Sequence, residues 1–110
     1  MSRKRQNSFS VKEPATAAVK NGVIRALSAQ QINGKANRVT CNRVIGIVQL
    51  TEQVDEEKVI NAIKELANSN HVLIGKASDD SHGFTKKKLS FNQRTILLIK
   101  TETFSDEQKS

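Results

Sequence analysis

The sequence contains no tryptophan or tyrosine, and its four phenylalanines bring the aromatic content to only 4%. Proteins that bind single-stranded nucleic acid, and RNA-recognition sheets, stack bases on exposed aromatic side chains. Four phenylalanines supply such a surface poorly, and they leave most of the interior to aliphatic side chains. We therefore expect an aliphatic core and little capacity for base stacking.

Cysteine and long apolar runs are also scarce. The single cysteine, Cys41, excludes an internal disulfide framework and fits a reducing compartment. Arg3, Lys4 and Arg5 stand near the N-terminus, but no apolar segment follows them, so no secretory signal is predicted. No apolar run approaches the roughly 20 residues of a membrane span. The sequence predicts a cytoplasmic, nucleoid-associated protein, or a nuclear one in a eukaryote, with no membrane partner.

Motifs for catalysis, metal binding and phosphate loops are missing as well. Cys41, His71 and His82 lack the C-x-x-C or H-x3-H spacing of metal ligands. Residues 79–82 (DDSH) include hydrolase residue types, but a catalytic triad is assembled across a fold and not within one turn. The five glycines form no phosphate-binding loop. We expect no catalytic residues, no metal, no cofactor and no enzymatic activity.

Acidic residues are rare in the first half of the chain. Residues 1–53 hold nine Lys and Arg against two acids, whereas residues 54–110 hold nine of each, so the net charge of +7 lies in the first half. Such an excess is typical of proteins that bind a polyanion, although it can also serve solubility alone. We expect a nucleic-acid partner, duplex DNA in preference to RNA, that meets the first half with help from the three lysines at 86–88.

The best-defined element is a helix followed by a strand within residues 54–77. Asp55 is predicted to cap the helix, and two glutamates follow it at the positive end of the helix dipole. Residues 68–70 end the helix, and residues 71–77 have the composition of a strand. The apolar stripe contains Val59, Ile60, Ile63, Leu66 and Ala67, and the opposite polar face contains Glu57, Asn61, Lys64, Glu65 and Asn68.

The N-terminal part predicts an arm and a first helix. Residues 1–13 are polar, basic and aperiodic, so we expect a flexible arm that lies along phosphates or in a minor groove, or is simply disordered. A helix is predicted over residues 15–31, with Pro14 in its first turn. The globular domain is expected to span residues 14–103, and residues 104–110 to form a disordered tail.

The C-terminal part predicts a hairpin with a long connection. Residues 95–103 (TILLIKTET) favour a second strand, which pairs most simply with the strand at 71–77. The connection over residues 78–94 is long for a hairpin. It contains either a short strand at residues 89–91 or a basic tip.

Residues 38–51 (RVTCNRVIGIVQLT) are compatible with either a helix or a strand. Their β-branched density favours a strand, while four of them also fit one face of a helix. In the helical case, residues 38–39 form a short strand, Thr40 caps the helix, and residues 51–54 form a turn. In the other case the order is α-β-α-β-β, an open sheet with both helices on one face.

The stretch from Thr40 to Lys76 resembles the winged helix-turn-helix superfamily, whose last helix is followed by a polar turn and a β-ribbon. The resemblance implies an α+β fold with a C-terminal β-hairpin and a DNA-binding function. The residues that carry it are Val59, Ile63 and Leu66 in the helix, Asn70 in the turn where that family often has Gly, and Val72 at the start of the ribbon.

The charge pattern and the resemblance define candidate contact residues. Asn and Lys can bond base edges if the helix over 55–69 enters a major groove, although the acidic residues 55–57 would repel phosphates there. The base-edge candidates are Asn61, Lys64 and Asn68. The candidates for contact with the nucleic-acid backbone are Arg3, Lys4, Arg5, Lys12, Lys35, Arg38, Arg43, Lys86, Lys87 and Lys88.

The expected function is therefore that of a small DNA-binding regulator or accessory factor in transcription or replication. A second hypothesis is a protein–protein adaptor or inhibitor whose basic half docks on an acidic protein partner. A third is an RNA-binding or ribosome-binding protein. The salt dependence of binding separates the first from the second, because phosphate contacts release counterions.

Overall fold

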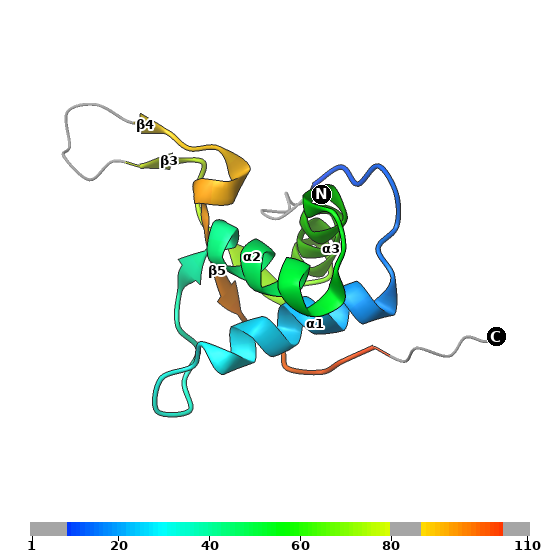
Figure 1. Cartoon of the computed structure of the whole chain (residues 1–110). Helices are drawn as coiled ribbons and strands as arrows, with labels where there is room; N and C mark the ends of the chain where they lie inside the picture. The colour runs from blue at the N-terminus through cyan, green and yellow to red at the C-terminus, as the bar shows by residue number, and fades with distance from the viewer. Residues whose placement is uncertain (1–8, 80–86, 105–110) are drawn as a thin grey trace, which may run out of the picture.

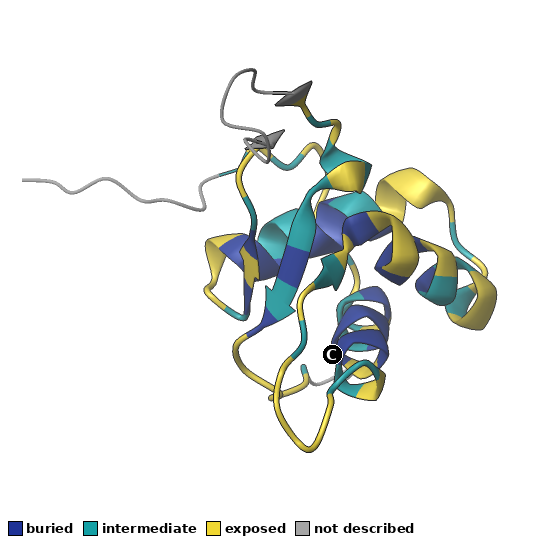
Figure 2. Cartoon of the chain, turned by 90° about the vertical axis from the view of Figure 1, so that its left-hand side faces the viewer, coloured by how far each residue is buried: buried dark blue, intermediate teal, exposed yellow. Residues whose placement is uncertain are grey.

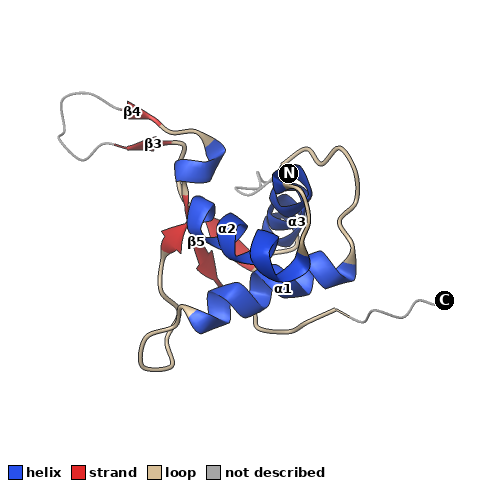
Figure 3. Cartoon of the chain, in the orientation of Figure 1, coloured by secondary structure: helices blue, strands red, loops and turns tan. Residues whose placement is uncertain are grey.

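Three helices cover one face of a small antiparallel sheet in this computed structural model, which describes residues 9–79 and 87–104 (Figures 1 and 3). The α+β class is the one that the sequence predicts. In chain order the elements are α1 (Ala17–Ala29), β1 (Val39–Thr40), α2 (Cys41–Glu52), α3 (Glu56–Asn68), β2 (Val72–Ile74), β3 (Ser78–Asp79), β4 (Lys87–Lys88), the 3-10 turn η1 (Phe91–Gln93) and β5 (Thr95–Leu98).

The sheet has the strand order β1-β5-β2, and both pairings are antiparallel. Ile96 of β5 lies between Val39 of β1 and Ile74 of β2, and Leu98 lies opposite Val72. The side chains of β2 and β5 alternate, so one set enters the core and the other faces away from it. The predicted pairing of these two strands is confirmed, although both are shorter than expected.

A second, two-stranded ladder interrupts the connection between β2 and β5. β3 pairs with β4, and residues 80–86 between them lie outside the described part of the chain. Of the two alternatives for this connection, the short strand at residues 89–91 is wrong, because η1 begins at Phe91. Ser90 is the N-cap residue of η1, and the Gln93 side chain accepts a hydrogen bond from the Ser90 backbone N–H through Oε1 (3.0 Å). The ladder projects from the rest of the domain at the upper left of Figure 1.

The stretch with two possible states on sequence alone is a helix. α2 begins after Thr40, whose Oγ1 accepts a hydrogen bond from the Arg43 N–H (3.3 Å). Val44, Ile45 and Val48 are buried along its inner face. Burial of a continuous apolar face outweighs the small intrinsic cost of β-branched residues in a helix. The α-β-α-β-β alternative is therefore wrong. The helix cap at Thr40 is confirmed, and the short strand is present but lies one residue later than predicted, at Val39–Thr40.

α3 follows the predicted boundaries closely. It begins after Asp55, although the Asp55 side chain makes no capping hydrogen bond. It ends in a Schellman motif, in which the His71 N–H donates to the Leu66 carbonyl (2.8 Å) and the Asn70 N–H to the Ala67 carbonyl (3.1 Å). Asn70 has a φ of 65°, a left-handed conformation that Asn tolerates better than most residues. A polar turn therefore replaces the glycine common at this position.

α1 begins later than the sequence predicts. Its cap is Thr16, whose Oγ1 accepts a hydrogen bond from the Val19 N–H (3.3 Å). Pro14 therefore lies two residues before the cap, and the prediction that it occupies the first turn is wrong. A threonine hydroxyl can satisfy a free N–H of the first turn, which proline cannot do.

The core is aliphatic, as predicted. None of the described helices combines the length and apolar character that a membrane crossing requires. Residues from all three helices and from β2 and β5 form one cluster of buried side chains, coloured dark blue in Figure 2. Its members are Val19, Val23, Ile24, Ala26, Leu27, Cys41, Val44, Ile45, Val48, Val59, Ala62, Ile63, Leu66, Ala67, Val72, Ile74, Ile96 and Leu98.

Asn61 contradicts the face assigned to it. The sequence predicts it on the outward side of α3, but its side chain is only 5% exposed. Residues 12–16 cross the helix here and line the spaces beside Asn61. The periodicity of α3 shows which residues face away from the core, but it cannot show that a segment distant in the sequence buries one of them.

The core assignment predicts that Ile63→Ala will be costly. Ile63 is 0% exposed, so its truncation should lower the free energy of unfolding by about 2–5 kcal/mol. Leu50 on α2 is 81% exposed, and Leu50→Ala should change it by less than about 0.5 kcal/mol. Urea denaturation of both variants measures the difference. Equal losses would show that Ile63 does not face the core.

Candidate nucleic-acid interface

An N-terminal segment, here termed the strap (residues 9–15), lies across the outward face of α3 (Figure 1). Two ion pairs of 3.9 Å each join it to the helix, Lys12 to Glu57 and Glu13 to Lys58. All four side chains are more than half exposed. Exposed pairs contribute only about 0–1 kcal/mol each. The contacts at the two ends of the strap therefore matter more than those in its middle.

The N-terminal end of the strap is held by Phe9. Its backbone N–H donates to Asn68 Oδ1 (2.8 Å), and Asn68 Nδ2 donates to the Phe9 carbonyl (2.9 Å). The Phe9 ring meets Phe91 edge to face, with centroids 6.0 Å apart, and the Arg94 guanidinium lies 5.5 Å from the Phe9 ring. We call Asn68, Phe91 and Arg94 the Phe9 site.

The C-terminal end of the strap is held by Glu65. The Ala15 N–H donates to Glu65 Oε2 (2.8 Å), and Lys20 Nζ lies 3.2 Å from Glu65 Oε1. Glu65 and Lys20 are both largely buried, so this pair is screened less than the exposed ones. Both ends of the strap are thus fixed to the C-terminal end of α3, at residues one helical turn apart, while its middle reaches the N-terminal turn at Glu57 and Lys58.

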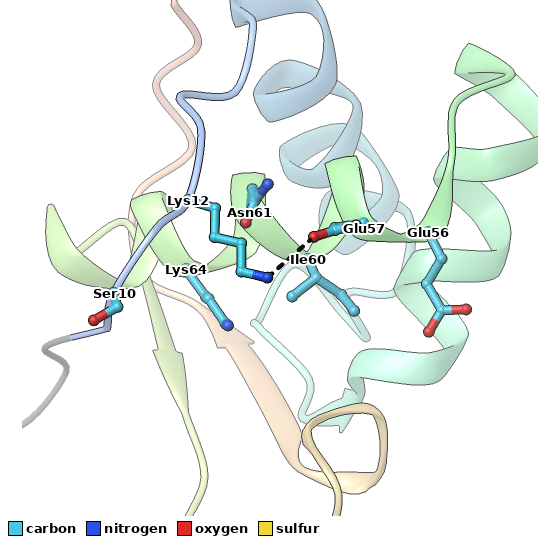
Figure 4. A pocket seen from close by; sticks show the side chains of 7 residues that line it. All are labelled: Ser10, Lys12, Glu56, Glu57, Ile60, Asn61 and Lys64. Carbon is cyan, nitrogen blue, oxygen red and sulfur yellow. Dashed lines mark ion pairs between the residues drawn. The ribbon is translucent and has the colours of Figure 1, made fainter.

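A groove of about 560 Å³, the α3 groove, opens beside the strap (Figure 4). Ser10 and Lys12 line it from the strap, and Glu56, Ile60 and Lys64 are among the residues that line it from α3. Ile60 provides an apolar surface between side chains of both charges. The groove is thus a mixed surface and not a cationic one.

All three base-edge candidates lie on this face, and each is already engaged or covered. Asn61 is buried beneath the strap. Lys64 Nζ lies 5.4 Å from the centroid of the Phe91 ring. Asn68 uses its carboxamide for the backbone of Phe9. The structure therefore places the three residues on one face of α3, but their polar groups do not form an exposed row that a base edge could contact.

Cations gather instead at the start of β5. The Arg38 guanidinium donates to Thr95 Oγ1 (3.4 Å), and Arg94 Nε donates to the Gly75 carbonyl (2.8 Å). Lys76 follows Gly75 directly and is exposed. These three cationic residues flank the strands β1, β2 and β5, and the guanidinium groups of Arg38 and Arg94 both lie near the start of β5.

The N-terminus of α2 adds to this end of the sheet. The Cys41 N–H donates to the Arg94 carbonyl (2.8 Å), which places the positive end of the α2 dipole there. Arg43 lies in the first turn, which contains no acidic residue, and donates to Gln30 Oε1 (3.1 Å). Lys35 is exposed in the turn between α1 and β1, where it pairs with Ile32 and not with this end of the sheet. We call Arg38, Arg43, Lys76 and Arg94 the basic end.

Other predicted phosphate contacts are more scattered. Lys12 belongs to the strap, where it pairs with Glu57. Lys87 and Lys88 form β4, and the Leu89 N–H donates to the Ala77 carbonyl (2.7 Å), which places the base of this ladder next to Lys76. Arg3, Lys4, Arg5 and Lys86 lie outside the described residues.

The basic end also differs from the other cations in its pairing. Among the side chains that the structure describes, those of residues 9–77 and 88–104, the ion pairs involve Lys12, Lys20, Arg25 and Lys58. No side chain of the basic end takes part in one of these pairs. Its positive charge is therefore not offset by a neighbouring carboxylate in this part of the chain.

Titratable groups offer little for chemistry in the described part of the chain. There, no three His, Cys, Asp or Glu side chains form a group that could hold a metal ion. Burial raises the pKa of the Cys41 thiol to about 12, and the nearby Arg94 only partly opposes that shift. At neutral pH the thiol is therefore protonated and a poor nucleophile.

Some interface residues escaped the sequence interpretation. Lys76 and Arg94 belong to the half of the chain with no net charge, so the charge distribution did not select them. Phe9 stands in a polar, aperiodic segment, and its contact with Phe91 joins residues far apart in the chain. The one signal in the sequence that could have indicated this contact is that each of the two segments, around Phe9 and around Phe91, contains an isolated aromatic residue.

Known proteins add no assignment to this interface. No protein-family model, curated protein or solved structure matches the chain. The functional argument therefore depends on the position, pairing and exposure of the side chains described above.

The shifted thiol predicts a specific pH dependence of stability. The Cys41 pKa is about 12 in the folded protein against 9.0 without burial, so the unfolded thiol ionises first. The stability linked to Cys41 is fully present below about pH 9 and is lost as the pH rises toward about 12. Urea denaturation from about pH 8 to about pH 11 should therefore show a steeper loss for the wild type than for Cys41→Ala. Parallel curves would contradict the assignment, because lysine titration is common to both proteins.

Proposed function

We propose that this chain is a small, non-catalytic nucleic-acid-binding protein of the winged-helix type, which serves as a DNA-binding regulator or accessory factor. The basic end is its proposed phosphate-contacting surface. The observation that carries this proposal is the gathering of four cationic residues, Arg38, Arg43, Lys76 and Arg94, around the start of β5 and the N-terminus of α2, none of them in an ion pair with a described carboxylate.

The order of the elements supports the winged-helix assignment. α3 is followed by a polar turn at residues 68–70, then by β2 and the projecting β3–β4 ladder. This is the succession of helix, turn and ribbon on which the sequence resemblance rests. The helix before it, α2, is short and capped by Thr40, as the helical reading of that segment requires.

The electrostatics of the helix ends favour the basic end over α3 as the phosphate contact. The first turn of α2 carries Arg43 and no acid, so its dipole and its side chain both attract an anion. The first turn of α3 carries Glu56 and Glu57, which repel phosphate. Contacts of this kind position a duplex without reading its sequence. We therefore expect binding with weak sequence preference.

Binding to random duplex DNA should weaken steeply as salt increases. Each phosphate contact that is lost should reduce the slope of log K against log salt concentration by about 0.9, so Arg38→Gln combined with Arg43→Gln should reduce it by about 1.8. Lys12→Gln combined with Lys58→Gln is the matched control. Both control lysines already pair with a glutamate, so their loss should leave the slope almost unchanged. Fluorescence anisotropy over a salt series measures all three proteins.

The same titration separates the alternatives. Equal slopes for the wild type and the Arg38→Gln, Arg43→Gln protein would place the phosphate contacts elsewhere. Absence of binding to both duplex DNA and structured RNA at low salt would remove the proposal in favour of an acidic protein partner. Preference for structured RNA in direct competition would change the class of nucleic acid.

A further inference from the structure

The Phe9 site exists independently of the strap. Asn68 lies at the end of α3, Phe91 in η1 and Arg94 just before β5, so the three belong to separate, packed elements. Arg94 is held in place by its hydrogen bond to the Gly75 carbonyl, whether or not Phe9 is present. The site is therefore preformed, which lowers the cost of binding a ligand there.

Asn68 recognises backbone and not side chain. Its carboxamide makes a donor–acceptor pair with the N–H and carbonyl of Phe9, as a neighbouring strand would. Any extended peptide offers the same pair of groups. Specificity then comes from the aromatic ring, which fits between Phe91 and Arg94.

The charges of the α3 groove suit a cationic peptide. Asp55, Glu56 and Glu57 stand together at the N-terminus of α3, against Lys58 and Lys64 on the same helix. Lys12 of the strap, three residues after Phe9, offsets part of this negative charge because it pairs with Glu57 (Figure 4). A nucleic-acid phosphate would meet repulsion at the same carboxylates.

The strap occupies this surface without filling it. About 560 Å³ of open groove remains beside Ser10 and Lys12. The Lys12 and Glu13 ion pairs are 3.9 Å long and exposed, so they hold the middle of the strap weakly. Asn61, 5% exposed and without a hydrogen-bond partner among the described residues, faces this region with an unused carboxamide.

We propose that the α3 groove and the Phe9 site form a peptide-binding surface, and that the strap is its intramolecular occupant. The partner is an extended protein segment with a phenylalanine followed three residues later by a lysine, as in Phe9-Ser10-Val11-Lys12. Such a segment binds by displacing the strap. This inference does not require nucleic-acid binding at the basic end, although the two surfaces share Arg94, because Asn68, Phe91 and the α3 groove lie outside the basic end.

The affinity follows from competition with the strap. A tethered segment reaches its site at an effective concentration of about 1 mM. If the strap is closed about nine times in ten, the same segment in trans has a dissociation constant of about 0.1 mM for the open site. The intact strap then weakens binding of the free peptide about tenfold.

The test uses the full chain carrying Phe9→Ala and a synthetic peptide of residues 3–16. The substitution removes the ring that holds the strap and leaves every charge in place. The peptide should bind this variant with a dissociation constant of about 0.1 mM and the wild type about tenfold more weakly. A peptide that itself carries Phe9→Ala should bind the variant at least about tenfold more weakly than the unchanged peptide.

Phe104→Ala is the matched control. Phe104 is held by the same kind of pairing, in which its N–H donates to Asn21 Oδ1 (2.7 Å) and Asn21 Nδ2 donates to its carbonyl (2.9 Å). Lys20 Nζ lies 4.4 Å from its ring. None of the residues in this contact lines the α3 groove or belongs to the Phe9 site, although Lys20 also pairs with Glu65 of α3. Phe104→Ala should therefore bind the peptide as weakly as the wild type does.

A second measurement covers the case in which Phe9→Ala unfolds the protein. The isotopically labelled wild-type chain is titrated with unlabelled peptide, and the backbone amide resonance of Phe9 in the chain's own strap is followed by NMR, because displacement frees this N–H from Asn68 Oδ1. It should shift with a midpoint of about 1 mM, and the Phe9→Ala peptide should leave it in place. Equal binding of the two peptides, or no shift at about 10 mM peptide, overturns the proposal. Tighter binding of duplex DNA to Phe9→Ala than to the wild type also overturns it, in favour of a covered nucleic-acid surface.

Discussion

The position of Arg94, just before β5, is the constraint on which both surfaces depend. Its carbonyl accepts the Cys41 N–H, which places the start of α2, and its guanidinium donates to the Gly75 carbonyl, which fixes the end of β2. The same guanidinium lies 5.5 Å from the ring of Phe9. Gly75 is required in this arrangement, because a Cβ there would collide with Thr95 Oγ1. One residue, through its carbonyl and its guanidinium, thus links the sheet, a helix terminus and the strap.

How well each helix could be predicted depended on how many local sequence signals agreed on its type and boundaries. α3 could be predicted because its cap, apolar stripe and terminal turn point to the same boundaries, and its Schellman ending replaces Gly with Asn70. α2 could not be assigned, because Val44 and Val48 fit a strand as well as a helix. Only their burial against the other helices decides between the two states. That is tertiary information, which no local pattern contains.

The candidate site was less predictable than the fold for the same reason. Asn61 and Asn68 belong to the face of α3 opposite its apolar stripe, and a polar helix face ordinarily meets solvent. The strap, some 50 residues earlier in the chain, covers one and binds the other. The composition of such a polar segment predicts disorder, because composition averages over all residues and does not reveal the effect of one side chain. In the structure the strap is ordered because a single aromatic ring, that of Phe9, binds a preformed site. Phe104 is ordered in a similar way, by the pairing of its backbone with Asn21.

The distribution of charge along the sequence does not map directly onto the surface. The first half carries the whole net charge of +7. However, three of its cations form ion pairs with glutamates of α2 and α3, namely Lys12, Lys20 and Arg25. Lys76 and Arg94, from the half with no net charge, join the basic end instead. Pairing across the fold therefore moves the effective positive charge away from α3 and toward the start of β5. A polyanion responds to this local potential and not to the sum over a segment, because exposed charges beyond about 10 Å are screened.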